Sequence, residues 1–512
     1  MSITSLYFPP FLALVLAAYF LVPKRAQWMA LLAFSVAFYV LAFGAWGYAL
    51  VLLTALSVWL AARRIQRISD DQRARLKAAR DEWTRDEKSA FRSAQKKRRR
   101  RVLTGTLALN FGILCAFKYL NFALSLVSLP PLFRWAAPLG ISFYTFQATG
   151  YLIDVYWENE RAEESFPRFL LFVSFFPQMT QGPISDHASL AEALRTPHSF
   201  AYERFARGSV RVIWGFAKKM LLANMLAPIV NDAFLHYAEY AGLTVLLSAF
   251  GYSAQIYADF SGYMDIMCGF CEILGIRLAE NFDHPYFSSS VAEYWRRWHM
   301  TLGAWFKKYV YYPIAVSRPA QRLGRRFSRA LPATVALAAV WFLTGLWHGA
   351  SLTYLAWGGV NGLIIIASLW LEPVYAKTRA ALGARENGVF FRGFRVARTF
   401  FLVTLIKVLP EVGTLADGFG FIGRIFAGPF LPTSLSALFP FTQNGAYLLC
   451  VFAFSVLLFS VSCVSLRRDV RSLFSRLPFF ARVLLLSALI VLIFLFGVPV
   501  TKNGGGFMYA QF

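Results

Sequence analysis

The chain has 512 residues, of which 57% are hydrophobic and only 15% are charged, and its mean hydropathy is +0.50. These values lie well above those of soluble globular domains and predict a polytopic membrane protein. A net charge of +25 would suggest a nucleic-acid partner in a soluble protein, but here the basic residues lie mostly between apolar runs. The positive-inside rule explains that pattern through cytoplasmic loops, so we expect membrane lipid and no nucleic acid as a partner.

Apolar runs at the start of the chain predict the first spans. Residues 6–22 lack a positive leader and a small-residue cleavage site, so we expect a retained first span with its N-terminus outside. The run from Trp28 to Ala62 would measure about 50 Å as one helix, too long for a hydrocarbon core of about 30 Å. We therefore expect two helices, with a break near Gly44 to Gly47.

The segment from Arg63 to Arg101 is the only long hydrophilic stretch, with sixteen Lys or Arg residues against six Asp or Glu. Its strong helix formers predict a helical hairpin at the cytoplasmic surface of a single domain that spans residues 1–512. A solvated topogenic loop is one interpretation. The other is a docking surface for an anionic donor, either a coenzyme A thioester or an acidic carrier protein.

The rest of the chain predicts further spans, to a total of about eleven. They are expected at Val102–Val127, Phe205–Phe234, Leu243–Ile276, Phe391–Leu409, Ala446–Leu466 and Phe479–Val498, and the run from Leu331 to Leu371 is expected to form two more. Residues 172–183 are too short to span and predict a re-entrant or interfacial element. Asp259 and Asp265 lie six residues apart, so we expect them to hydrogen-bond the backbone of a broken helix and not to form a catalytic pair.

The stretch from Glu293 to Gly349 concentrates ionisable groups inside sequence otherwise suited to lipid. Such groups are costly at membrane depth and mark functional sites or wet cavities. Glu293 and Arg297 are spaced i, i+4, as are Trp295 and His299, which predicts one helix that carries an ion pair beside a histidine.

His348 ends an apolar run, and we expect the long segment to break at His348–Gly349. A desolvated imidazole is neutral and can accept a proton, as a general base or an acyl-accepting nucleophile requires. A hydrogen-bonded packing role is the alternative. The sequence has no histidine pair at metal-ligand spacing, so we expect no metal.

Several motifs together resemble the membrane-bound O-acyltransferase (MBOAT) family, in particular its bacterial branch of alginate O-acetylation and teichoic acid D-alanylation proteins. They are Tyr294-Trp-Arg-Arg-Trp-His299-Met-Thr-Leu302, Tyr309-Val-Tyr-Tyr-Pro313, Gly345-Leu-Trp-His348-Gly-Ala350, Tyr257-Ala-Asp-Phe-Ser-Gly-Tyr-Met-Asp265, Phe175-Phe-Pro-Gln178, Gly182-Pro-Ile184, Lys118-Tyr-Leu-Asn-Phe122 and Phe507-Met-Tyr-Ala-Gln-Phe512.

The resemblance implies an all-α bundle of spans, with re-entrant and peripheral helices around a central funnel, in the bacterial cytoplasmic (inner) membrane. It implies that His348 and His299 are catalytic and that five further residues line or brace the site: Trp295, Arg297, Trp298, Trp347 and Asn361. The implied donor is cytoplasmic acetyl-CoA, without a metal. The acetyl group would reach an extracellular polysaccharide directly or through an extracytoplasmic SGNH-like acetyltransferase.

Three departures leave the acceptor open: Asn361 stands where many alginate-type members have histidine, Lys307-Lys308 stands where Arg-Asp is frequent, and the Arg63–Arg101 segment is long. The nearest rival is D-alanyl transfer from an acyl carrier protein to teichoic acid. A rival of another class is a transporter or flippase, whose buried charges line a path without bond-making.

Overall fold

The computed structural model describes residues 5, 7–132, 137–381, 388–439 and 444–497. This part of the chain is helical, and its sole extended pairing is an isolated bridge between Phe282 and Trp298. The all-α architecture expected from the sequence is confirmed. The motif at Phe507–Phe512 and the end of the last predicted span at Val498 lie outside the described residues.

The chain divides into two compact units, and the first comprises Met1–Phe205 with Cys271–Ala279. Its helices are α1 (Phe8–Leu21), η1 (Lys24–Ala26), α2 (Gln27–Phe43), α3 (Ala45–Ala78), α4 (Arg85–Lys118), α5 (Leu120–Leu126), α6 (Ile141–Tyr156), α7 (Phe166–Ser174), α8 (Phe176–Met179) and α9 (His187–Arg195). The expected break near Gly44 is present, because Gly44 adopts a φ of 93° between α2 and α3. The short, buried α7 and α8 fit a segment that does not span.

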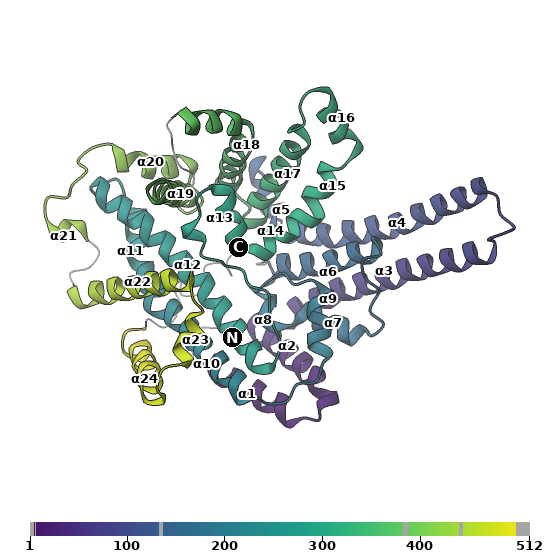
Figure 1. The fold of residues 1–512 in the computed structure, drawn as a ribbon, viewed down its shortest axis with the longest axis horizontal. Helices are drawn as coiled ribbons and strands as arrows, with labels where there is room; N and C mark the ends of the chain where they lie inside the picture. The colour runs from purple at the N-terminus through teal and green to yellow at the C-terminus, as the bar shows by residue number, and fades with distance from the viewer. Residues whose placement is uncertain (1–4, 6, 133–136, 382–387, 440–443, 498–512) are drawn as a thin grey trace. The chain divides into compact units, whose positions relative to one another are not determined.

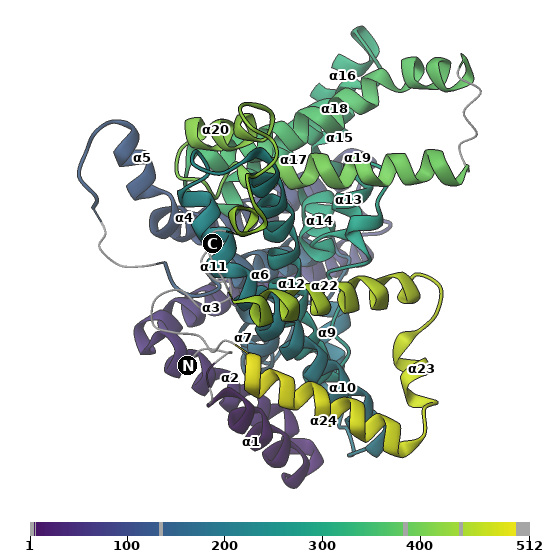
Figure 2. The ribbon, with the colours of Figure 1, turned by 90° about the vertical axis from the view of Figure 1, so that its left-hand side faces the viewer.

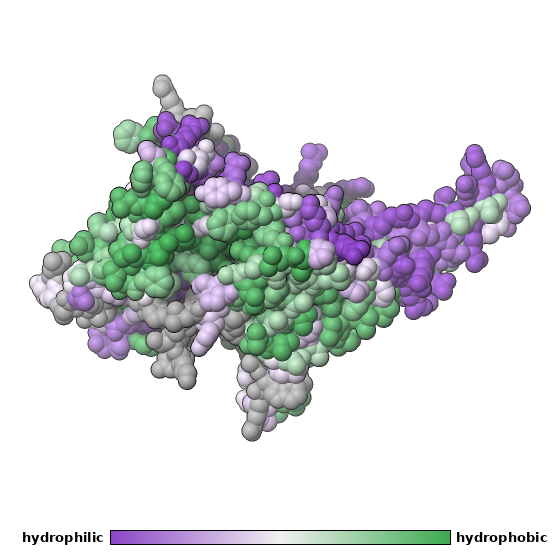
Figure 3. Space-filling model, turned by 90° about the horizontal axis from the view of Figure 1, so that it is seen from below, coloured by the Kyte–Doolittle hydropathy of each residue, from purple (hydrophilic) through white to green (hydrophobic). Residues whose placement is uncertain are grey.

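The hydrophilic stretch between Arg63 and Arg101 is helical on both sides of a turn, as α3 continues to Ala78 and α4 begins at Arg85 (Figure 1). The side chain of Thr84 caps α4 by accepting a hydrogen bond from the backbone of Glu87, whose carboxylate accepts one from Thr84 in return. This capping box satisfies backbone groups at the start of the helix. Figure 3 shows a mostly hydrophilic surface over the projecting end of the hairpin, which suits water or lipid headgroups more than hydrocarbon.

The second unit comprises Ala206–Phe270 and Glu280–Phe512. Two of its helices cross the boundary with the first unit, α10 (Tyr202–Ala217) and α12 (Gly242–Leu274). The others are η2 (Lys218–Ala223), α11 (Asn224–Leu235), η3 (Pro285–Phe287), α13 (Val291–Arg297), α14 (Met300–Phe306), η4 (Lys307–Tyr311), α15 (Tyr312–Ala315), α16 (Arg318–Arg326), α17 (Leu331–His348), α18 (Leu352–Ala381), α19 (Val389–Val408), α20 (Leu415–Phe426), α21 (Leu435–Leu438), α22 (Gly445–Ser465), α23 (Val470–Ser475) and α24 (Phe479–Phe496).

Seven described helices are long and apolar enough to cross a membrane, or eight if the bent pair α4 and α5 counts as one span. The protein is therefore a multi-pass membrane protein. The predicted spans over α1, α12 and α19 are helical but do not meet these criteria of length and composition, and α1 has only 14 residues. The total of about eleven spans stays a prediction.

Asp259 and Asp265 both lie inside the continuous helix α12 and form ion pairs. Asp259 pairs with Lys219, and Asp265 pairs with Lys218 at 2.6 Å and with Arg211 at 2.9 Å. The prediction that they hydrogen-bond the backbone of a broken helix was wrong. The partner cations come from α10 and η2, about 40 to 54 residues away in sequence, so nearby sequence gave no sign of them.

Helices α17 and α18 pack with their backbones in close contact, and α19 lies beside α18 (Figure 2). A Cβ atom on Gly358 would lie 2.6 Å from the carbonyl oxygen of Trp341 and 2.9 Å from the Cα atom of Gly345. Only glycine allows this approach, as small residues do at helix contacts in membranes. The close packing brings the end of α17, where His348 lies, against aromatic side chains of α18.

Candidate active site

His348 is the last residue of α17, and its ring is packed among aromatic rings. The helix ends there as expected, since Gly349 has extended backbone and α18 begins at Leu352. The ring of Tyr354 fills the place where a side chain on residue 349 would stand, which requires glycine at that position. The imidazole lies 4.8 Å from the ring of Trp357 and stacks at 6.4 Å on the ring of Tyr354, measured between ring centroids.

His299 lies between two short helices, with a left-handed backbone at φ 49° and ψ 51°. Asn281 holds the start of α14, because its side-chain oxygen accepts hydrogen bonds from the backbone and hydroxyl of Thr301, at 3.1 and 2.7 Å. Its backbone carbonyl accepts a third, from the N–H of Met300 at 3.1 Å. Non-glycine residues in this conformation are uncommon and cluster at functional sites.

The expectation that one helix carries both Trp295 and His299 was wrong, because α13 ends at Arg297 and α14 starts at Met300. The predicted ion pair is confirmed, with 2.9 Å between Arg297 and Glu293. Burial alone would raise the pKa of Glu293, but hydrogen bonds from Ser289 and the charge of Arg297 outweigh it and lower that pKa. Helices α13 and α14 have seven residues each, so both are too short to span a membrane. Burial lowers the pKa of His299, which lies between them, to about 3.

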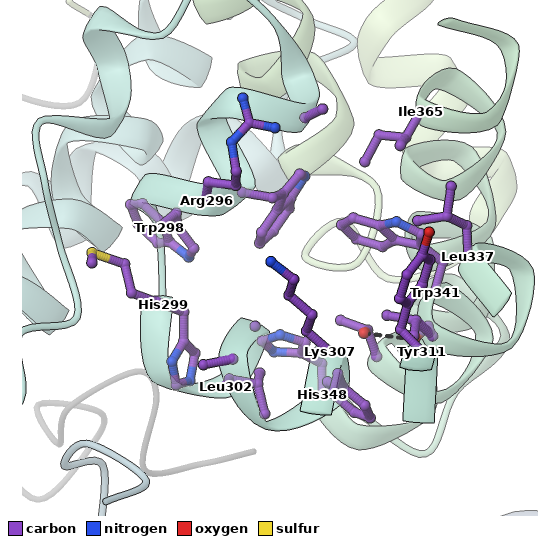
Figure 4. A pocket seen from close by; sticks show the side chains of 18 of the residues that line it. Arg296, Trp298, His299, Leu302, Lys307, Tyr311, Leu337, Trp341, His348 and Ile365 are labelled. Atoms are coloured by element: carbon purple, nitrogen blue, oxygen red, sulfur yellow. Dashed lines mark hydrogen bonds between the residues drawn. The ribbon is translucent and has the colours of Figure 1, made fainter. Parts of the chain in front are cut away.

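Both histidines line one pocket of about 590 Å³, which we call the site pocket (Figure 4). Its volume lies in the usual range for small-molecule sites. Arg296 and Lys307 also line it, and none of its described lining residues is acidic. In Figure 4 the Lys307 side chain points into the open space between Trp298 and Trp341. The pocket therefore offers two imidazoles and a positive charge to an anionic ligand.

The predicted tryptophans are arranged around the two imidazoles. Trp295 and Trp298 line the site pocket, and Trp347 lies 5.7 Å from the ring of His299 and 4.8 Å from that of His348. The Trp295 indole N–H donates to the side-chain oxygen of Asn361 at 2.9 Å, so Asn361 braces the pocket wall without lining the pocket. Arg297 pairs with Glu293 outside the pocket lining, whereas its neighbour Arg296 lines the pocket.

A second, smaller cavity of about 30 Å³, which we call the rear cavity, also borders His348. Its wall includes Lys407, in the last turn of α19, and Glu411, three residues beyond the end of that helix. A space of this size is sufficient for a single water molecule. Sequence reasoning missed both residues, and it also missed Asn281. The one available signal was a lysine inside an apolar run at 401–409, which marks a buried cation.

Within the described ranges, no three His, Cys, Asp or Glu side chains lie together as metal ligands do. The site pocket presents imidazoles, indoles and basic side chains. A neutral imidazole held beside an activated carbonyl is suited to general-base or nucleophilic catalysis of acyl transfer.

Comparison with known proteins gives a consistent result. Residues 158–396 match the profile of MBOAT, the membrane-bound O-acyltransferase family, and this range includes His299 and His348. The chain is 33% identical over 327 residues to a probable alginate O-acetylase of Pseudomonas syringae pv. tomato, covering 62% of this chain and 58% of that protein. It is 30% identical over 299 residues to a peptidoglycan O-acetyltransferase of Helicobacter pylori, covering 52% and 54%.

A teichoic acid D-alanyltransferase of Streptococcus thermophilus is 29% identical over 241 residues, which cover 46% of this chain and 57% of that protein. In each of these three comparisons the chain spans less than two thirds of the relative's length. The range matched by the family profile, residues 158–396, contains both pocket histidines and all the other predicted site residues. Residues 158–396 of the chain are therefore similar to the membrane-bound O-acyltransferase family.

Proposed function

We propose that the protein is an O-acyltransferase that takes an acetyl group from cytoplasmic acetyl-CoA for O-acetylation of an extracellular polysaccharide. The observation that carries the proposal is the meeting of His299 and His348, from separate parts of the chain, in one pocket of about 590 Å³. The relatives named as alginate O-acetylase and peptidoglycan O-acetyltransferase support the choice of an acetyl group and a glycan acceptor. The proposed location of the protein is the bacterial cytoplasmic membrane.

In this proposal His348 is the general base. Its neutral imidazole takes the proton of the acceptor hydroxyl while the oxygen bonds to the acetyl carbonyl carbon. The carbon–sulfur bond then breaks, and the imidazolium returns the proton to the departing thiolate, so that free CoA and an acetyl ester result. General-base catalysis of this kind contributes about 10²- to 10⁴-fold in rate.

The remaining pocket residues would position the donor and stabilise charge. Arg296 and Lys307 supply positive charge to the anionic thioester, and no acidic lining residue opposes them within the described pocket. His299 orients substrate or stabilises developing charge beside Trp347. The acceptor is a polysaccharide or an extracytoplasmic SGNH-like acetyltransferase that passes the group on.

The test uses the purified full chain in lipid vesicles, with acetyl-CoA labelled in the acetyl group and an extracellular glycan as acceptor. We expect free CoA to appear together with labelled ester on the glycan or on a supplied partner transferase. Consumption of a D-alanyl carrier protein in place of acetyl-CoA would instead support the D-alanylation alternative, which the teichoic acid relative favours. Transport of an unchanged substrate, with no thioester consumed, would overturn the proposal.

A further inference from the structure

Three side chains line both the site pocket and the rear cavity: Trp295, Trp298 and His348. They therefore form a wall between the two spaces, which we call the partition. A group that reacts at His348 lies against this wall. Any group longer than the space in front of the partition would have to displace an indole towards the rear cavity. That cavity, at about 30 Å³, has no room for a ring.

Different side chains hold the two indoles of the partition in place. Trp295 donates its N–H to Asn361, which is itself anchored through a 2.9 Å hydrogen bond to the carbonyl of Trp357. Trp298 has no such hydrogen bond among the described contacts. It instead stacks on Tyr294, with 5.6 Å between ring centroids and 22° between ring planes, and its face meets the ammonium of Lys407 at 4.1 Å.

Lys407 is buried, with 5% of its surface exposed, and its surroundings are aromatic. Its Nζ atom lies 4.7 Å from the ring centroid of Tyr286 and 5.1 Å from that of Tyr294, and it donates to the Tyr286 hydroxyl at 2.8 Å. It forms no ion pair in the part of the chain that the structure describes. The three ring faces and the Tyr286 hydroxyl are the partners that the structure gives this side chain, and Trp298 is the nearest of the rings.

Every one of these rings belongs to the segment 286–298, which leads directly into His299. Lys407 comes from α19, more than 100 residues further along the chain. The ammonium thus ties α19 to the wall of the site pocket. A longer or looser contact at this point would remove one of the contacts that hold the Trp298 indole in place.

We propose that Lys407 is a positioning residue that fixes Trp298 in the partition and thereby restricts the acyl group at His348 to a short one such as acetyl. The inference rests on the proposed function, since it names the acyl size that the same site selects. Lys407 acts through the indole and does not touch the reacting atoms. The selectivity would come from the cost of moving Trp298 towards a rear cavity that is too small for a ring.

The test compares initial rates of CoA release from acetyl-CoA and butyryl-CoA for the full chain in lipid vesicles. We expect wild type to prefer acetyl-CoA, and Lys407→Met to raise the butyryl-to-acetyl rate ratio at least about fivefold, since hydrophobic pockets discriminate single methylenes by about tenfold or more. Methionine keeps the length of the side chain and removes the charge. Lys407→Arg keeps a cation that stacks on indole, so its ratio should stay within about twofold of wild type.

The rate ratio is an internal control, because a loss of folded protein lowers both rates equally. Trp298→Phe keeps an aromatic ring in the partition but makes it smaller, so this variant should also raise the butyryl-to-acetyl rate ratio. It provides the test if Lys407→Met does not fold. An unchanged ratio in these variants, with active wild type, would overturn the inference while leaving the proposed function intact. Loss of acetyl preference in both the Met and the Arg variants would also overturn it, because packing and not charge would then fix Trp298. Absence of any CoA release by wild type would instead contradict the proposed function.

Discussion

Replacing His299 with glycine and, separately, with alanine removes the same imidazole from two different backbones. Residue 299 has φ 49° and ψ 51°, where a side chain costs about 1–2 kcal/mol and glycine costs nothing. Glycine loses about 0.4–1 kcal/mol more than alanine when the unfolded chain is ordered. The balance favours His299→Gly over His299→Ala by about 0.5–1 kcal/mol, whereas alanine would be favoured at a right-handed position.

The assay is the thermal midpoint of both variants in the same detergent, together with CoA release from acetyl-CoA. We expect the glycine variant to unfold about 1–2 °C higher, because the shift for a given free-energy change becomes smaller in larger proteins. Both variants should lose acyl transfer by at least about tenfold, since both lack the ring that orients substrate or stabilises charge. An alanine variant as stable as the glycine variant would refute the left-handed backbone and, with it, the direction in which the His299 ring is held.

Two further predictions concern buried ionisable side chains. Lys219→Met leaves Asp259 in α12 without its cation and with 1% of its side chain exposed, so we expect the free energy of unfolding to fall by about 3–5 kcal/mol. The loss should appear as a lower folded fraction in size-exclusion chromatography, and the double variant with Asp259→Asn should recover most of it. Equal folded fractions for the single and double variants would contradict the ion pair. The pKa of His299 is lowered by burial from 6.5 to about 3, so the unfolded state binds more protons between these values and stability falls as pH falls through that window. The thermal midpoint of wild type should therefore drop more between pH 7 and pH 5 than that of His299→Gln, and parallel curves would show that the imidazole is not buried.

Helix ends could be predicted where an apolar run was too long to cross the bilayer as one helix. A run of apolar residues too long for the bilayer must break, and Gly44 and Gly349 mark the places where it does. The two pocket histidines were predictable from their motifs, because each motif includes residues that the family resemblance assigns to the site. Their meeting in one pocket depended on that resemblance, since no spacing rule relates residue 299 to residue 348.

The features that the sequence did not predict depend on contacts between distant segments. Trp295 and His299 have helical spacing, but Asn281 captures the start of α14 and breaks the helix between them. Lys407 lies in an apolar run and was assigned to a span, yet its three ring contacts come from residues 286–298. A single sequence gives the composition of such segments but not which of them fold against each other.

The most direct measurement is the rate of acetyl transfer by His348→Ala compared with His236→Ala. His236 is an exposed histidine that follows α11 and lies outside both cavities, so it controls for the loss of an imidazole elsewhere. We predict that His348→Ala, folded and inserted in the membrane, loses transfer by at least about 10²-fold while His236→Ala keeps the wild-type rate. Transfer by folded His348→Ala at a rate near that of wild type would contradict the role of this imidazole in handling the acyl group.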